Sequence, residues 1–121
     1  PGQDTGALAA AGGVTGTTPA AGKAVFTGIG GCGGCHVLAA AGSNGAVGPN
    51  LDTRLRADCA SPASKPIRGA SLQQCIRTAT VKPYAYLPPG YAAGIMPANF
   101  GQKLTPSEIT ALVNFLSTAA K

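Results

Sequence analysis

Residues 32–36 of the chain read Cys-Gly-Gly-Cys-His, and this stretch restricts the fold more than any other. Two thiols three residues apart project on the same side of a helical turn, and an imidazole follows directly. This spacing is typical of covalent haem attachment, in which each thiol adds to one vinyl group. The histidine then lies beneath the iron and supplies a ring nitrogen as proximal ligand. The motif therefore predicts one haem held by Cys32 and Cys35, with His36 as an iron ligand.

Two other interpretations of the cysteines are weaker. A redox dithiol usually lies at the end of a strand in a βαβ pattern, and no strand pattern persists in this sequence. A zinc site is possible on ligand types, because the chain has four Cys and one His. However, Cys59 and Cys75 form no second CxxC pair, and their spacing fits no common zinc module. The sequence favours haem.

The composition is consistent with a core built around a large apolar group. The chain has 121 residues, enough for one domain, with three Phe, three Tyr and no Trp among them. Eighteen Gly and ten Pro add loop content. A small chain so short of bulky side chains gains stability from a cofactor at its centre.

The net charge of +5 raises the question of an acidic partner. The nine Lys and Arg residues are dispersed, whereas nucleic-acid binding needs them clustered. The charge indicates instead electrostatic steering toward an acidic partner surface, an effect that salt weakens. No apolar run approaches the roughly 20 residues of a transmembrane helix.

The first 17 residues are small, polar or Ala/Gly-rich, so they cannot bury enough surface to offset chain entropy. We expect a flexible leader or linker over 1–17, which could join the domain to a membrane anchor or another domain, or a frayed terminus. A single folded domain is then expected over 18–121. The chain begins at Pro1 with no Met and no signal peptide, which indicates a processed form or an excised piece.

Three helices are predicted between long loops. The first begins at Thr18-Pro19, with Thr as N-cap, and ends at the glycines of 28–31. A loop is expected over 37–56, a short helix over 71–80, and mostly loop over 81–104, which carries several prolines. The fold class is all-α.

The last helix has the clearest signal. The sequence predicts a capping box at Thr105 and Glu108, in which each side chain accepts a hydrogen bond from the backbone N–H of the other residue. Apolar residues then recur at helical spacing along one face, at positions 109, 112, 113 and 116.

The second axial ligand is predicted from elimination and from context. His36 is the only histidine, which excludes a second imidazole from the same chain. Met96 is the only methionine and precedes a proline, in a loop just before the last helix. A lone Met is ordinarily a core gap-filler, but this one lies on no periodic apolar face. A thioether favours Fe(II), raises the reduction potential and blocks small molecules from the iron.

With these residues in order, the chain resembles the class I monohaem cytochromes c over about residues 18–120. The first-helix pair Gly22 and Phe26 and the last-helix pair Leu112 and Phe115 are similar to the family's packed helix pair. The resemblance implies the cytochrome c fold, with three to five helices and long loops wrapped around one covalent haem c.

The resemblance also assigns roles around the iron. Pro49, in the turn Gly48-Pro49-Asn50-Leu51, is similar to the proline whose carbonyl accepts the ring N–H of the proximal histidine. Met96-Pro97 is similar to the family's axial methionine motif. The glycine-rich stretch just before Cys32 departs from the family, and no motif decides which of Tyr84, Tyr86 and Tyr91 contacts the haem propionates.

Cys59 and Cys75 lie outside the family's general pattern. These two cysteines are left over once Cys32 and Cys35 hold the haem. An even number of remaining cysteines in a protein matured outside the cytoplasm predicts a disulfide. Two free thiols are the alternative.

The predicted function is one-electron transfer between redox partners of a respiratory or photosynthetic chain, in the periplasm or another extracytoplasmic space, with no enzymatic activity of its own. Partners would dock where small or apolar residues surround the haem edge, at Gly33, Gly34, Ile95 and Pro97. One alternative is a cytochrome domain of a larger oxidase or dehydrogenase complex. Another is a haem peroxidase or gas sensor, which needs an open iron position and distal acid–base groups.

Overall fold

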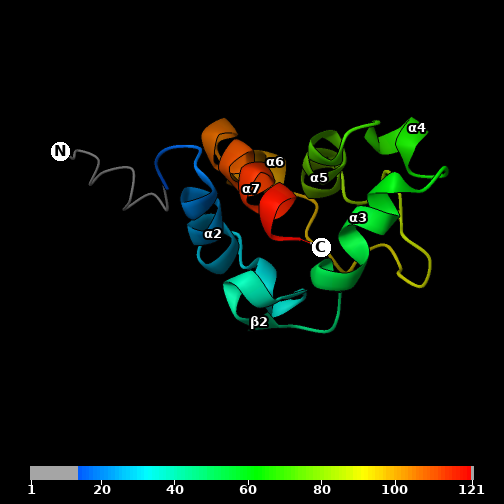
Figure 1. Ribbon diagram of the computed structural model, residues 1–121, viewed down its shortest axis with the longest axis horizontal. Helices are drawn as coiled ribbons and strands as arrows, with labels where there is room; N and C mark the ends of the chain where they lie inside the picture. The colour runs from blue at the N-terminus through cyan, green and yellow to red at the C-terminus, as the bar shows by residue number, and fades with distance from the viewer. Residues whose placement is uncertain (1–13, 121) are drawn as a thin grey trace.

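A computed structural model describes residues 14–120, and the chain folds into helices joined by long loops (Figure 1). The α-helices are α2 (Pro19–Thr27), α3 (Leu51–Ala60), α4 (Lys65–Arg68), α5 (Leu72–Val81), α6 (Phe100–Lys103) and α7 (Pro106–Ala119). Among them, α4 and α6 are four-residue turns. The all-α prediction is confirmed, as are the predicted helices at 18–27, 71–80 and 105 onward.

The first and last long helices, α2 and α7, pack against each other and form the most extensive helix contact (Figure 1). Gly22 permits this approach, because a Cβ there would lie 1.9 Å from the carbonyl oxygen of Ala111. One turn later, the rings of Phe26 and Phe115 meet edge to face, with centroids 5.9 Å apart. The two residue pairs that the sequence analysis compares with the family's packed helices therefore belong to helices that cross each other in the structure.

Side-chain caps fix where the helices begin. Thr18 accepts a hydrogen bond from the backbone N–H of Ala21 at the start of α2. Thr105 and Glu108 form the predicted capping box of α7, and Ser71 and Gln74 form a second one at the start of α5. These local signals place three helix starts at the residues that the sequence indicates.

One expected loop is partly helical. Residues 51–56 belong to α3, so the prediction of a loop over 37–56 is wrong at its end. Asn50 begins the helix, because its side-chain oxygen accepts from the backbone N–H groups of Asp52 and Thr53. In the predicted turn Gly48-Pro49-Asn50-Leu51, the asparagine is therefore the N-cap of α3.

The remaining part of 37–56 contains two strands of two residues each. β1 (Val37–Leu38) pairs antiparallel with β2 (Ser43–Asn44), with Val37 opposite Asn44. Between them lies the 3₁₀ turn η2 (Ala39–Ala41). The hairpin lies beneath α2 in Figure 1 and covers the end of the molecule that carries the cysteine motif.

Residues 14–17 of the expected leader contact the last helix. The backbone N–H of Val14 donates to a carboxylate oxygen of Glu108, and the side-chain amide of Asn114 donates to the carbonyl of Thr17. The rest of the leader, 1–13, lies outside the described residues, and the division into a 1–17 leader and an 18–121 domain stays a prediction. Between residues 14 and 120, no helix combines the length and apolar character needed to cross a membrane.

Candidate functional site: a haem cavity

A cavity of about 470 Å³ lies among α2, α3, α5, α7 and the loop before α6. Its volume falls in the range of small-molecule and cofactor sites, about 300–1,000 Å³. Most lining side chains are apolar, among them Phe26 and Leu112 of the crossed helices. The five residues predicted for the haem site all line it: Cys32, Cys35, His36, Pro49 and Met96.

The cysteine motif forms a tight turn at one side of the cavity. The 3₁₀ helix η1 (Cys32–Gly34) is closed by hydrogen bonds from the backbone N–H groups of Cys35 and His36 to the carbonyl of Cys32. The preceding Gly31 has φ +59°, a left-handed conformation that glycine adopts without strain. The turn therefore places both thiols and the imidazole along the same cavity.

The ring of His36 is held on one side by backbone. Its Nδ1 lies 2.8 Å from the carbonyl oxygen of Pro49, and a carbonyl only accepts, so Nδ1–H is the donor. In the neutral imidazole this leaves Nε2 without a proton and able to bind a metal. Burial lowers the pKa of His36, which also favours the neutral form, while the hydrogen bond to Pro49 acts in the opposite direction.

Gly48 brings a second stretch of backbone against the same ring. A Cβ at Gly48 would lie 2.6 Å from Cε1 of His36, closer than atoms can approach. Its N–H donates to the carbonyl of Cys35, with N and O 2.7 Å apart. The sequence did not assign a role to this glycine, although it directly precedes the proline that orients the histidine.

Cys32 and Cys35 form no disulfide, so the sulfur of each can bond to haem. Burial raises the pKa of the Cys32 thiol to about 11, against a smaller opposing effect of its backbone hydrogen bond. The thiol is therefore neutral near pH 7, which suits a group that ends as an uncharged thioether in an apolar cavity.

Met96 belongs to the loop of residues 82–99, which joins α5 to α6 and lines the cavity from another side. The hydroxyl of Tyr84 donates to the carbonyl oxygen of Met96 and ties two distant parts of this loop together. Gly94, with φ +92°, turns the backbone two residues before Met96. The tyrosine contact was not predicted, since nothing in the local sequence connects positions 84 and 96.

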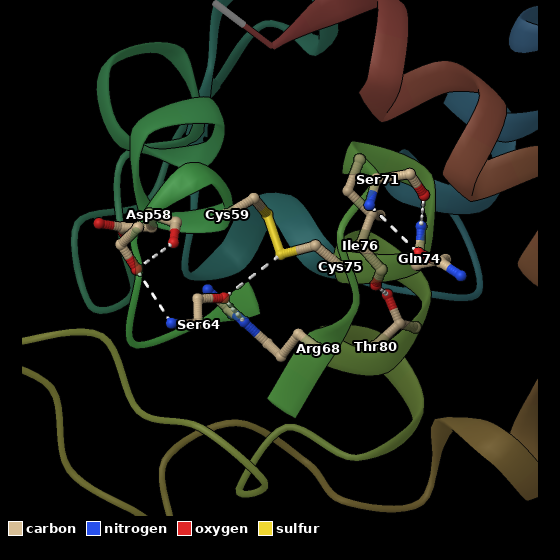
Figure 2. The surroundings of a disulfide bond; sticks show 10 residues. Asp58, Cys59, Ser64, Arg68, Ser71, Gln74, Cys75, Ile76 and Thr80 are labelled. Carbon is tan, nitrogen blue, oxygen red and sulfur yellow. Dashed lines mark hydrogen bonds between the residues drawn. A yellow bond between two sulfur atoms is a disulfide. The ribbon is translucent and has the colours of Figure 1, made fainter. Parts of the chain in front are cut away.

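The predicted disulfide is present. Cys59 of α3 and Cys75 of α5 are bonded, with sulfurs 2.05 Å apart, and both residues are buried (Figure 2). Ser64 lies beside the bridge, with its Oγ 4.0 Å from the sulfur of Cys75. The same Oγ accepts a hydrogen bond of 2.7 Å from Nε of Arg68. Figure 2 shows this chain of contacts running from the disulfide to the arginine.

Arg68 is a further site residue that the sequence does not reveal. Only 5% of its surface is exposed, and it lines the cavity. Its guanidinium carbon lies 4.6 Å above the ring centre of Tyr86, which lines the same cavity. As one of nine dispersed basic residues, it gave no sign in the sequence of being buried.

The zinc interpretation has no counterpart in the described part of the chain. Over residues 14–120, no three His, Cys, Asp or Glu side chains gather closely enough to hold a metal ion. Cys59 and Cys75 are bonded to each other rather than available as ligands.

Comparison with protein families agrees with the geometry of this cavity. The family model described as Cytochrome c matches residues 19–120, nearly the whole chain. The chain belongs to the cytochrome c family. Comparison with curated proteins gives no match. Members of the cytochrome c family carry covalently bound haem c and typically transfer electrons, so this cytochrome carries one haem c as its cofactor.

The residues of this cytochrome fit the haem on structural grounds as well. The thiols of Cys32 and Cys35 and the free Nε2 of His36 supply the covalent and metal-binding chemistry at one side of an apolar cavity. A second polar group, the buried Nη2 of Arg68, has no hydrogen-bond partner among the described residues. An apolar cavity with these few polar groups is the kind of site that a largely apolar cofactor occupies.

Proposed function

We propose that this cytochrome transfers single electrons between redox proteins, with His36 and Met96 as the axial ligands of its haem. When bound, the haem supplies an iron that accepts and releases one electron. The observation that carries the proposal is the placement of both side chains on one cavity, together with the hydrogen bond from His36 to Pro49. The attachment residues are Cys32 and Cys35.

The chain's own residues favour a site that changes little on electron transfer. The bond of 2.8 Å to Pro49 fixes the orientation and tautomer of His36. Tyr84 holds the backbone of Met96 by its hydroxyl. A fixed histidine ring and a tethered methionine backbone limit the rearrangement that accompanies a change of charge.

The surface beside the cavity suits a transient partner. Val47 and Ile95 both line the cavity and are more than half exposed, at 56% and 57%. Small apolar contacts of this kind, together with the net positive charge of the chain, favour a weak and fast complex with an acidic protein surface.

We further propose that the cytochrome works in the periplasm or another extracytoplasmic space, in a respiratory or photosynthetic chain. The Cys59–Cys75 bond supports this location, because disulfides persist mainly in oxidising compartments. A cytochrome domain within a larger oxidase or dehydrogenase complex is the second candidate, with 1–17 as its linker to a further domain or a membrane tether. A peroxidase or gas sensor is disfavoured, because Met96 lies on the cavity where such proteins need an open iron position.

A redox titration followed by absorbance tests the proposal. The haem-loaded protein should show a single one-electron wave, and its oxidised form should show the far-red band of a thioether bound to Fe(III). The variant Met96→Ala should lose that band, whereas Ile95→Ala, a change at the neighbouring exposed residue, should keep it. An unchanged low-spin spectrum in Met96→Ala would refute the ligand assignment.

A further inference from the structure

The loop of residues 82–99, which carries Met96, makes few hydrogen bonds to the rest of the fold. The bond from Tyr84 to Met96 lies within the loop itself. Among residues 14–120, one hydrogen bond joins positions 83–98 to a helix or strand, and Arg54 of α3 donates it. Its Nη2 lies 3.3 Å from the carbonyl oxygen of Pro89. The position of the loop therefore depends on α3 as well as on its own two ends (Figure 1).

Arg54 contacts this loop at a tight turn. The backbone N–H of Tyr91 donates to the carbonyl of Pro88, with N and O 3.2 Å apart, and Gly90 between them has φ +94°. The guanidinium carbon of Arg54 lies 5.0 Å from the ring centre of Tyr91, which is within the range of a cation–π contact. One side chain thus holds the turn at two points, the carbonyl of Pro89 and the ring of Tyr91.

Asp58 directs the guanidinium toward the turn. It lies one helical turn after Arg54 in α3, and its Oδ1 is 3.3 Å from the same Nη2 that reaches Pro89. The side chains of Arg54 and Asp58 are 31% and 16% exposed, so water screens this pair only in part. Because both residues belong to one helix, the pair limits the freedom of the guanidinium and lowers the entropic cost of its contact with the loop.

The turn forms part of the haem cavity, although Arg54 does not. Pro88, Gly90 and Tyr91 line the cavity, as does Met96, whereas Arg54 lies outside the lining. Any effect of Arg54 on the iron must therefore pass through the loop. With the turn held as far as Tyr91, the unrestrained stretch that carries Met96 shortens to residues 92–98. A shorter stretch has fewer open conformations, so opening becomes less favourable.

We propose that Arg54 is a positioning residue that holds the loop of residues 82–99 closed over the cavity and thereby keeps Met96 on the iron. This inference rests on the proposed function, since it takes Met96 as an axial ligand. Arg54 and Tyr84 have separate tasks: the arginine joins the loop to α3, and the tyrosine joins two parts of the loop to each other.

The variant Arg54→Lys tests the assignment, because it retains a positive charge beside Asp58 and removes the planar guanidinium that reaches two points of the turn. The matched control is Arg77→Lys, at an exposed arginine of α5 that bonds to Thr110 of α7. At saturating cyanide, the rate at which cyanide replaces Met96 on the oxidised iron reports how often the loop opens. This rate should rise about fivefold in Arg54→Lys and stay at the wild-type value in the control. Equal rates in the two variants would overturn the proposal.

The urea dependence of the cyanide rate separates opening of the loop from unfolding of the whole chain. Opening one loop exposes little surface, so urea below the unfolding transition should change the rate in Arg54→Lys only slightly. If Arg54 instead acts only on global stability, the rate should rise with urea as steeply as global unfolding does. That steep dependence would contradict a role in the loop.

A double-mutant cycle with Tyr91→Leu tests the contact itself. Tyr91→Leu removes the ring that the guanidinium of Arg54 faces, so the cyanide rate should rise in this variant too. If both residues act through one contact, the rate of the double variant should be lower than the product of the two separate increases predicts. Increases that multiply in full would show that Arg54 and Tyr91 act independently, against the proposal.

If Arg54→Lys yields no haem-loaded protein, Tyr91→Leu alone tests the same contact from the side of the loop, and an unchanged cyanide rate there would refute the assignment. The wild-type protein separates this inference from the proposed function. An oxidised wild type without the far-red thioether band would refute both. A wild type with the band, together with an Arg54→Lys variant that has the wild-type cyanide rate, would refute only the role of Arg54.

Discussion

The side of the cavity that carries His36 and the side that carries Met96 are built differently. The histidine wall, Cys32–His36 with Gly48 and Pro49, consists of short segments joined by backbone hydrogen bonds of 2.7–3.2 Å and by the bond from the ring to Pro49. The methionine wall, residues 82–99, is a single loop in which one tyrosine hydroxyl reaches the backbone of Met96. Many of its residues, including Ile95, are exposed.

This difference indicates which ligand controls access to the iron. A ligand held by several buried backbone contacts stays in place, whereas a loop with few buried contacts opens locally at a lower free-energy cost. We expect the histidine wall to set the stability of the haem site and the methionine wall to set how often it opens. The predictions below test each wall.

The largest expected effect concerns the disulfide, which fixes the helix that leads into the methionine wall. Cys59 and Cys75 close a loop with a sequence separation of 16. Replacing both by Ser should lower the free energy of unfolding by about 3 kcal/mol in the chain-entropy estimate. Urea unfolding of the haem-loaded variant and of wild type, without and with reductant, measures it. A reductant that shifts wild type but not the double variant supports the assignment; equal midpoints for both proteins would contradict it.

A smaller effect is expected in the histidine wall. Gly48→Ala would place a Cβ 2.6 Å from the ring of His36 and should cost about 2 kcal/mol of stability through overpacking. Gly34→Ala is the matched control in the same wall, because a Cβ there meets no atom within 4 Å. Thermal unfolding of the two haem-loaded variants compares them. Similar melting temperatures would mean that the backbone at residue 48 can shift to accommodate the added methyl group, and would contradict the prediction.

The smallest effect is expected at Tyr84. Tyr84→Phe removes the hydroxyl that donates to Met96 and should cost about 1 kcal/mol, the net value of one hydrogen bond. Only the methionine wall should be destabilised, so its loop should open more often. Cyanide should therefore replace Met96 on the oxidised iron faster than in wild type. Tyr86→Phe provides the comparison, since Tyr86 contacts Arg68 through its ring. Equal cyanide rates in Tyr84→Phe and wild type would show that the hydroxyl does not restrain the loop.

Local patterns in the sequence were sufficient for much of the histidine side. The spacing of Cys32, Cys35 and His36 by itself indicates covalent haem attachment. The caps at Thr18 and Thr105 involve residues only three positions apart. Such features are readable because every participant lies within one turn of chain. The start of α3 was missed for a related reason, because Asn50 follows a Gly-Pro pair that is equally typical of a turn.

The contacts that the sequence did not reveal are those made across the fold. Tyr84 contacts Met96, which lies 12 residues later in the sequence, and Gly48 contacts the ring of His36, which lies 12 residues earlier. The burial of Arg68 depends on the disulfide and on Tyr86, which come from other elements. No periodicity or spacing encodes such meetings, because they depend on how the elements pack.

Carbon monoxide binding by the reduced protein at neutral pH tests the central claim most directly, since it asks whether His36 and Met96 together close the iron. If Met96 is the second axial ligand, as proposed, wild type should bind no carbon monoxide within minutes. Met96→Ala should bind it stoichiometrically, because the histidine wall keeps His36 in place and leaves the opposite side open. Binding by wild type as tight as by Met96→Ala would show an open iron and contradict the account of an electron carrier.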